Sequence, residues 1–145
     1  MHNPAISLRV VSWPQAESAL RQIRQQVFIQ EQCVPLDLEW DGLDEQATHL
    51  LLEVEHQPVA CARLLATQQL GRMAVLAKWR GIGLGSRVMQ CAIEYAQQQA
   101  WDNIQISAQI HAVGFYQRFG FQITSEPYLD AGILHCDMVL PLSTI

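Results

Sequence analysis

The feature that most constrains the fold is a run of three glycines at alternate positions, Gly81, Gly83 and Gly85. An apolar, strand-like segment precedes the run at residues 70–77, and a segment with helical periodicity follows it at residues 84–99. Glycines let backbone N–H groups crowd together without Cβ clashes, and the helix directs its unpaired N–H groups into the turn. The run therefore predicts an anion site suited to a pyrophosphate.

The composition limits the chain to a few classes of protein. It has 145 residues, half of them apolar, which predicts one compact domain over residues 1–145. The net charge of −5 and the lack of a basic run argue against a nucleic-acid partner. The four cysteines form no C-x-x-C pair, and neither a signal peptide nor a membrane-spanning apolar run is visible. We therefore expect a soluble, cytoplasmic protein with no membrane partner.

The remaining periodicities predict a mixed sheet flanked by helices. Ser12 and Gln15 form a candidate capping box before the first helix, and residues 31–46 read as a long irregular loop. The order of elements favours an α/β (α+β) fold with about six to seven mostly antiparallel strands, and excludes a doubly wound sheet or a barrel. Strands are expected at residues 6–11, 49–55, 59–66, 70–77, 104–107, 121–124 and 133–140, with helices at residues 16–27, 84–99 and 112–118.

The glycine run does not fit the common nucleotide-binding loops. A Walker loop needs Lys followed by Ser or Thr directly after its last glycine, whereas Ser86 and Arg87 stand here. A dinucleotide fingerprint opens an early βαβ unit and has an acidic residue about 20 positions later; here strands come first and Asp102 lies at a turn. The phosphorylated ligand is therefore of another kind.

A second motif gives the glycine run a family context. The pattern Arg80-x-x-Gly83-x-Gly85 after a strand, followed on the next helix and turn by the sequence FYQRFGF at residues 115–121, resembles the GNAT superfamily of acetyl-CoA-dependent N-acetyltransferases. Segments at residues 24–32, 39–44, 71–75 and 107–109 resemble its ElaA-like and YjcF-like branches. The resemblance covers about residues 20–140.

The resemblance implies a GNAT fold and an acetyl-CoA site. Two strands, near residues 73–77 and 104–107, would splay apart to admit the pantetheine arm, and an unpaired strand edge suits an extended partner with two amides. The backbone N–H of Val75 would polarise the thioester carbonyl. Arg80 or Arg87 would neutralise part of the negative charge of the pyrophosphate. The implied cofactor-binding residues are Met73, Ala74, Val75, Arg80, Gly81, Ile82, Gly83, Leu84, Gly85, Ser86, Gln109 and Tyr116.

The resemblance also suggests catalytic roles. Tyr116 is the expected general acid that protonates the departing CoA thiolate. Glu31 leads as general base, because partial burial in the cleft would raise its pKa. Alternative bases are His49, His111, His135 or a bound water, and a ping-pong route would need a nucleophile at Cys33 or Cys136. We expect direct attack by the amine in a ternary complex, without a metal.

The acceptor is expected to be a primary amine, and an uneven charge distribution suggests a cationic one. No lysine or arginine lies between Arg24 and Arg63, whereas eight carboxylates do. Asp41 and Asp44, together with Glu31 and His135, form the expected acceptor site. A non-catalytic CoA-binding or sensing module is the alternative. An edge strand such as the C-terminal one could also pair two copies into a homodimer.

Overall fold

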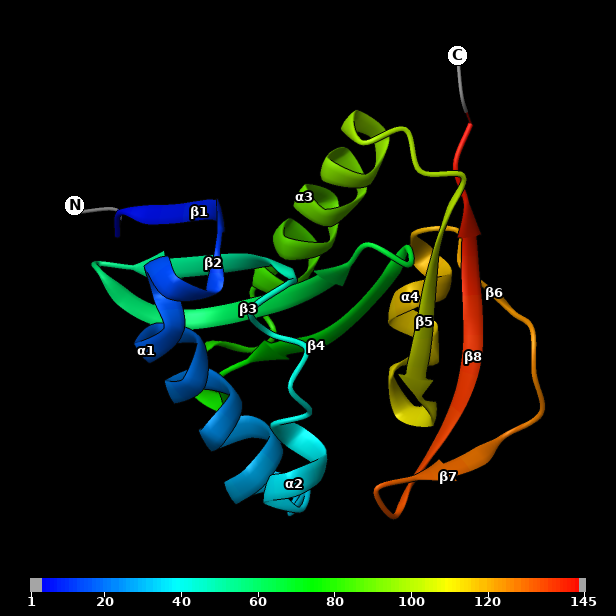
Figure 1. Cartoon of the computed structure of the whole chain (residues 1–145), viewed down its shortest axis with the longest axis horizontal. Helices are drawn as coiled ribbons and strands as arrows, with labels where there is room; N and C mark the ends of the chain where they lie inside the picture. The colour runs from blue at the N-terminus through cyan, green and yellow to red at the C-terminus, as the bar shows by residue number, and fades with distance from the viewer. Residues whose placement is uncertain (1–3, 144–145) are drawn as a thin grey trace.

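The computed structural model describes residues 4–143 and contains one mixed, eight-stranded sheet with helices on both faces (Figure 1). The strand order is β1-β2-β3-β4-β5-β8-β6, and β7 also pairs with β8. The strands are β1 (Ile6–Val11), β2 (Thr48–Val54), β3 (Gln57–Leu65), β4 (Gln69–Val75), β5 (Asn103–Gln109), β6 (Gln122–Ile123), β7 (Tyr128–Asp130) and β8 (Ile133–Pro141). The helices and helical turns are α1 (Trp13–Arg24), η1 (Gln25–Glu31), α2 (Leu36–Glu39), η2 (Ala77–Trp79), α3 (Leu84–Gln98), η3 (Ile110–Ala112) and α4 (Val113–Arg118).

The expected α+β architecture is confirmed, with two corrections. Strand β7, a three-residue strand that pairs antiparallel with the start of β8, was not expected from the sequence. The expectation that the C-terminal strand is an exposed edge is wrong, because β8 lies between β5 on one side and β6 and β7 on the other. The outer edges of the described sheet are β1 on one side and β6 and β7 on the other, so the expected pairing of two copies through β8 has no free strand edge to use.

Helix α1 begins with the expected capping box and covers one face of β2–β4. The Ser12 N–H donates to Gln15 Oε1 at 2.8 Å, and the Gln15 N–H donates to Ser12 Oγ at 3.4 Å. Leu20 and Ile23 are fully buried against the sheet. The helix continues into the π-helical turn η1, and the four-residue helix α2 follows after a short connection. The expected irregular segment at residues 31–46 therefore contains one short helix.

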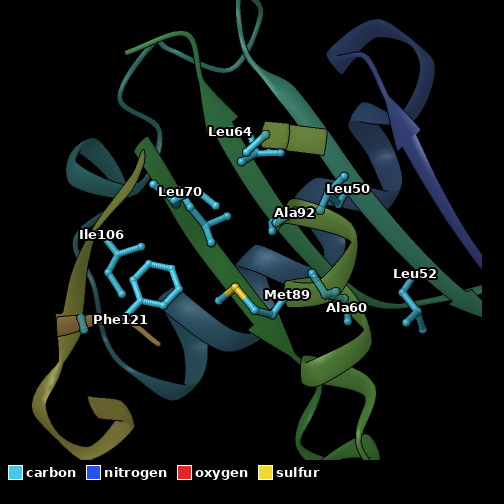
Figure 2. Packing of buried hydrophobic residues seen from close by; sticks show 14 of the residues in the cluster. Leu50, Leu52, Ala60, Leu64, Leu70, Met89, Ala92, Ile106 and Phe121 are labelled. Carbon is cyan, nitrogen blue, oxygen red and sulfur yellow. The ribbon is translucent and has the colours of Figure 1, made fainter. Parts of the chain in front are cut away.

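Helix α3 packs on the opposite face and forms the larger core. Its Met89 and Ala92 are fully buried, and Figure 2 shows them facing apolar side chains of the sheet such as Leu64 and Leu70. Along β5, Ile104, Ile106 and Ala108 are buried in this core, whereas the residues between them point away from α3. The C-terminal half of the sheet thus has one apolar face and one largely polar face.

Strands β4 and β5 are parallel neighbours that stay paired at one position only. Gln69 and Gln105 are partners near the start of the two strands, and from there the strands diverge toward their carboxyl ends (Figure 1). On its other side, β4 remains paired with β3 as far as Val75. The expected splay is confirmed, and it divides the sheet into β1–β4 and β5–β8.

Candidate functional site

A cavity of about 1010 Å³ opens where β4 and β5 diverge. Its walls come from β4, β5 and β8, from η1 and α2 on one face of the sheet, and from the first turn of α3 and from α4 on the other. Most of the residues singled out from the sequence line it. Of the expected site residues, the cavity is lined by Glu31, Met73, Ala74, Val75, Arg80, Gly85, Gln109, Tyr116 and His135.

The backbone of Val75 points its polar groups into the gap. The Leu76 N–H donates to Val59 O on β3 at 2.9 Å. Because successive residues of an extended strand turn their N–H and C=O groups to opposite edges, Val75 directs its own toward the gap. Its carbonyl there accepts a hydrogen bond from Arg80 Nε at 2.8 Å. The edge of β4 thus offers backbone donors and acceptors to an extended ligand.

The glycine run forms the turn that the sequence predicts, directly before α3. Gly81 and Gly83 have φ angles of +83° and +86°, a region that favours glycine. Gly83 is the N-cap, and the first helical bond runs from the Arg87 N–H to its carbonyl at 3.2 Å. The N–H groups of residues 84–86 therefore have no partner within the helix. This positive end of a four-turn helix lies beside the open edge of β4, and together they fit a diphosphate attached to an amide-containing chain.

Arg80 and Glu31 form an ion pair at this site, which changes the interpretation of both. The Arg80 guanidinium donates to both carboxylate oxygens of Glu31, at 2.7 and 2.8 Å. The hydrogen bond from Arg80 lowers the pKa of Glu31, which lies on an exposed part of η1. The expectation that burial raises this pKa is therefore wrong. A glutamate held in this way is a weak proton acceptor.

Tyr116 lies on α4 and lines the cavity next to the first turn of α3. Its ring packs edge-on against Phe115 and Phe121, at centroid distances of 5.3 and 5.6 Å. Burial raises the pKa of Tyr116 to about 12. Its hydroxyl forms no hydrogen bond within residues 4–143. The side chain is thus a phenol that stays protonated and is free to donate.

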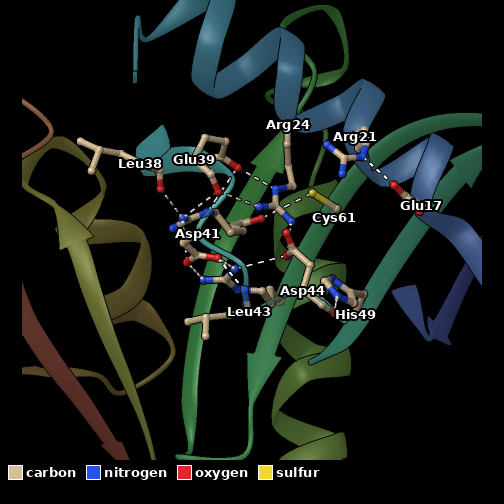
Figure 3. Close-up of polar contacts among 12 residues, drawn as sticks. Glu17, Arg21, Arg24, Leu38, Glu39, Asp41, Leu43, Asp44, His49 and Cys61 are labelled. Carbon is tan, nitrogen blue, oxygen red and sulfur yellow. Dashed lines mark hydrogen bonds and ion pairs between the residues drawn. The ribbon is translucent and has the colours of Figure 1, made fainter. Parts of the chain in front are cut away.

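The acidic segment is neutralised by arginines that are distant in sequence (Figure 3). Asp44 accepts from Arg24 at 2.6 Å, and both residues are buried. Asp41 accepts two hydrogen bonds from Arg63, each at 2.9 Å. Desolvation by itself would raise the pKa of Asp41, but the hydrogen bonds from Arg63 and the Leu43 N–H, together with the charges of Arg63 and Arg72, outweigh it and lower the pKa to about 2. Neither aspartate lines the cavity, and arginines already pair with both carboxylates, which argues against the expected role of Asp41 and Asp44 in binding a cationic acceptor.

The same cluster fixes α2 to the sheet. Glu39 is 2% exposed and accepts from Arg24 Nε at 2.7 Å, while Arg72 Nη2 donates to the backbone carbonyls of Leu38 and Glu39. Arg72 has a φ of +49° within an irregular stretch of the β3–β4 pairing, which directs its side chain toward α2. The cluster therefore holds one wall of the cavity in place.

The polar face of β5, β7 and β8 forms the facing wall. Tyr128 donates to Asp137 Oδ1 at 2.6 Å and also hydrogen-bonds Ser107. His135 is 8% exposed, stacks on the Tyr128 ring and bonds Ile133 O through Nδ1 at 2.7 Å. Ser107 and Asp137, which line the cavity, and Tyr128, which hydrogen-bonds both of them from behind the lining, were not among the residues expected from the sequence. The polar–apolar alternation of β5 and β8 was the signal that could have found this wall.

Gln109 reaches across the cavity. Its Nε2 donates to Oε1 of Gln32, which follows η1, at 2.8 Å. Its expected role at the cofactor stays a prediction, and the contact adds a link between the two halves of the sheet.

The other candidates occupy different positions. His49 is buried, bonds Asp44 O through Nε2 at 2.9 Å and does not line the cavity. Cys136 is also buried, and desolvation raises its pKa, which disfavours a thiolate nucleophile. Cys33 is exposed.

Residues 4–143 contain no group of three His, Cys, Asp or Glu side chains placed to hold a metal ion. Within the same residues no helix is both long and apolar enough to cross a bilayer.

Comparisons with known proteins agree with this geometry. The model of the acetyltransferase (GNAT) domain family matches residues 14–142. The uncharacterized N-acetyltransferase YjcF of Bacillus subtilis is 32% identical over 81% of this chain and 86% of its own length. Protein ElaA of Escherichia coli is 34% identical over 83% of this chain and 84% of its own. The crystal structure of ElaA superposes with a TM-score of 0.85 at 29% identity, covering 93% of this chain and 99% of ElaA. A putative N-acetyltransferase from Lactobacillus plantarum gives a TM-score of 0.87 at 27% identity, over 96% and 99% of the two chains.

Proposed function

Because the chain belongs to the GNAT acetyltransferase family, we propose that it transfers an acetyl group from acetyl-CoA to a primary amine. The family implies the use of an acyl-CoA. The observation that carries the proposal is the divergence of β4 and β5 beside the N-terminus of α3. When bound, acetyl-CoA supplies an activated acyl group as a thioester.

The residues of the gap fit that ligand. The backbone groups of Met73 and Val75 on the edge of β4 that faces the gap, with Ala74 between them, suit the amides of the pantetheine arm once Arg80 releases the Val75 carbonyl. The Val75 N–H can stabilise charge on the thioester oxygen. The turn residues Gly81, Ile82, Gly83, Leu84, Gly85 and Ser86 would hold the diphosphate through backbone N–H groups. Arg80 would add positive charge after leaving Glu31.

Tyr116 is the proposed general acid for the CoA thiolate. A pKa of about 12 lies well above the ordinary value near 8.5 of a thiol, so proton transfer from the isolated phenol is uphill by roughly 5 kcal/mol. Its contribution therefore comes from position and hydrogen bonding as negative charge develops on sulfur. Direct attack by the amine in a ternary complex fits a cavity that reaches both faces of the sheet.

Release of CoA tests the proposal. The full chain is incubated with acetyl-CoA in the presence of one amine at a time, taken from simple alkyl amines, polyamines, aminoglycosides and lysine peptides. The release of free thiol is followed and compared with a reaction that contains no amine. At least one amine should accelerate thiol release and become acetylated by mass. If acetyl-CoA binds but no amine accelerates release, the alternative of a CoA-binding or sensing module is favoured instead.

A further inference from the structure

We propose that His135 is the general base that takes the proton from the acceptor amine. The inference rests on the proposed acetyl transfer and replaces Glu31 in that role. It is carried by the hydrogen bonding of the imidazole ring, by its place in the cavity and by the state of the competing groups.

The hydrogen bond of Nδ1 fixes the tautomer of the neutral ring. His135 Nδ1 lies 2.7 Å from the carbonyl oxygen of Ile133, which can only accept. Nδ1 must therefore carry the proton, and Nε2 keeps a free lone pair. No residue within 4–143 forms a hydrogen bond with Nε2. His135, which is only 8% exposed, thus presents one unpartnered proton acceptor in the wall of the cavity.

The ring is held rigidly. It stacks on Tyr128 with a centroid distance of 6.2 Å and an interplanar angle of 20°. Tyr128 is fixed in turn by its hydrogen bonds to Asp137 and Ser107. A base whose ring is oriented by two contacts loses little entropy when it meets its substrate.

The position of His135 suits an acceptor that meets a thioester in the gap. In the β5–β8 register it stands opposite Gln109, the last residue of β5, at the end where β4 and β5 are apart. Val75, at the corresponding end of β4, lines the same cavity, as does Tyr116. The proposed base and acid therefore share one cavity with the open strand edge.

Competing bases are less suited. Glu31 is exposed, and once Arg80 leaves it for the diphosphate no other hydrogen bond within the described chain orients its carboxylate. The Nε2 of His49 is occupied by Asp44 O outside the cavity. His111 lines the cavity, but it is exposed on the short turn η3, and no hydrogen bond within the described chain orients it. His135 alone among these four combines an oriented ring with a free lone pair in the cavity.

The step balances without a further reactant. The amine nitrogen forms a bond to the acyl carbon, and the carbon–sulfur bond breaks. The proton leaving the amine goes to His135 Nε2, and the thiolate takes a proton from Tyr116 or from water. Solvent then removes the proton from the imidazolium and restores the tyrosine.

The first test reads the tautomer without any acceptor. Long-range ¹H–¹⁵N spectra of the full chain, with the signal assigned by its loss in His135→Asn, report which ring nitrogen is protonated. The Nδ1–H form is expected at a pH where the ring is neutral. The Nε2–H form would overturn the proposal whatever the enzyme's activity.

The second test measures turnover. In His135→Asn the side-chain amide can still donate to Ile133 O, but no base remains. With a strongly basic primary amine such as methylamine, or the best amine of the panel, kcat/KM should fall by about 100-fold or more while acetyl-CoA affinity is unchanged. With the weakly basic trifluoroethylamine the loss should be smaller, because its proton leaves more readily. His56→Asn, at an exposed turn where φ is +66°, is the matched control.

The outcomes separate the two proposals. A native protein that acetylates no amine contradicts the proposed function. If the native protein acetylates an amine and His135→Asn does so equally well, the role of His135 is contradicted but the proposed function is not. The same holds if His111→Asn, rather than His135→Asn, lowers kcat/KM. If His135→Asn does not fold, as judged by its unfolding midpoint, His135→Gln replaces it and the tautomer measurement still decides.

Discussion

Arg80 holds the carboxylate of Glu31 with both terminal nitrogens and the carbonyl of Val75 with its Nε. One guanidinium thus spans from η1 to the open edge of β4. The sequence assigns Arg80 to the diphosphate and Glu31 to the acceptor, but in the structure each is the other's partner. Cofactor binding through Arg80 therefore competes with this ion pair.

Replacement of Glu31 by Gln should tighten acetyl-CoA binding. The change frees Arg80 from an exposed pair whose free energy is about 0.2–1 kcal/mol, so the dissociation constant should fall by up to about fivefold. Calorimetric titration measures it. The control is Glu17→Gln, which removes the partner of Arg21 at 2.8 Å in an exposed pair on α1. Weaker binding in Glu31→Gln would contradict the competition.

Replacement of Tyr116 by Phe should lower kcat by about 100-fold while leaving the fold intact, because only the proton donor is removed. The raised pKa of about 12 predicts that native activity shows no decline from tyrosine ionisation between pH 7 and about pH 10. Rate–pH profiles with the best amine check both points. Tyr95→Phe, which removes a hydroxyl bonded to Thr48 at 3.1 Å outside the cavity, is the matched control. Equal activity in both variants would exclude Tyr116 as the acid.

Arg24→Ala should destabilise the protein by about 3–5 kcal/mol, because it leaves the buried carboxylates of Glu39 and Asp44 without their shared cation. Urea unfolding measures the loss. Arg9→Ala removes an exposed pair with Glu53 and should cost less than about 1 kcal/mol. Similar losses in the two variants would show that the cluster contributes no more than a surface pair.

The ion pairs of Asp41 should make stability depend on acid pH. The folded pKa of about 2 lies below the unfolded value of 3.8, so the stabilisation is present above about pH 4 and is lost as the pH falls through about 2. After allowance for solvent screening it amounts to about 1 kcal/mol. Asp41→Asn should therefore be less stable than the native protein at pH 7, with the difference shrinking between about pH 4 and pH 2. Asp37→Asn, at an exposed position of α2, is the control for removing a charge from this segment.

Elements with strong local signals could be predicted from the sequence. The capping box of Ser12 and Gln15, the glycine turn and the periodicity of residues 84–98 each depend on neighbours a few residues apart. The divergence of the two strands and the binding of acetyl-CoA were expected from a family resemblance carried by two motifs, the glycine run and the FYQRFGF sequence at residues 115–121. The three-residue strand β7 has too little local pattern to be found.

The errors concern contacts between distant residues. The acidic segment looks free in sequence because no basic residue lies within it, yet Arg24, Arg63 and Arg72 reach it from α1, β3 and β4. The same holds for Glu31, whose partner is 49 residues away. An acidic run in the sequence therefore does not predict an acidic surface in the fold when arginines from other strands and helices pack against it.

The most direct test of the account is an amide-resolved NMR titration of the full ¹⁵N-labelled chain with acetyl-CoA. The account predicts saturable shifts at one site, largest at Met73, Val75 and residues 81–86, because the thioester arm lies along β4 and the diphosphate at the start of α3. An absence of saturable shifts, or shifts confined to β1 and the outer face of α1, would contradict it.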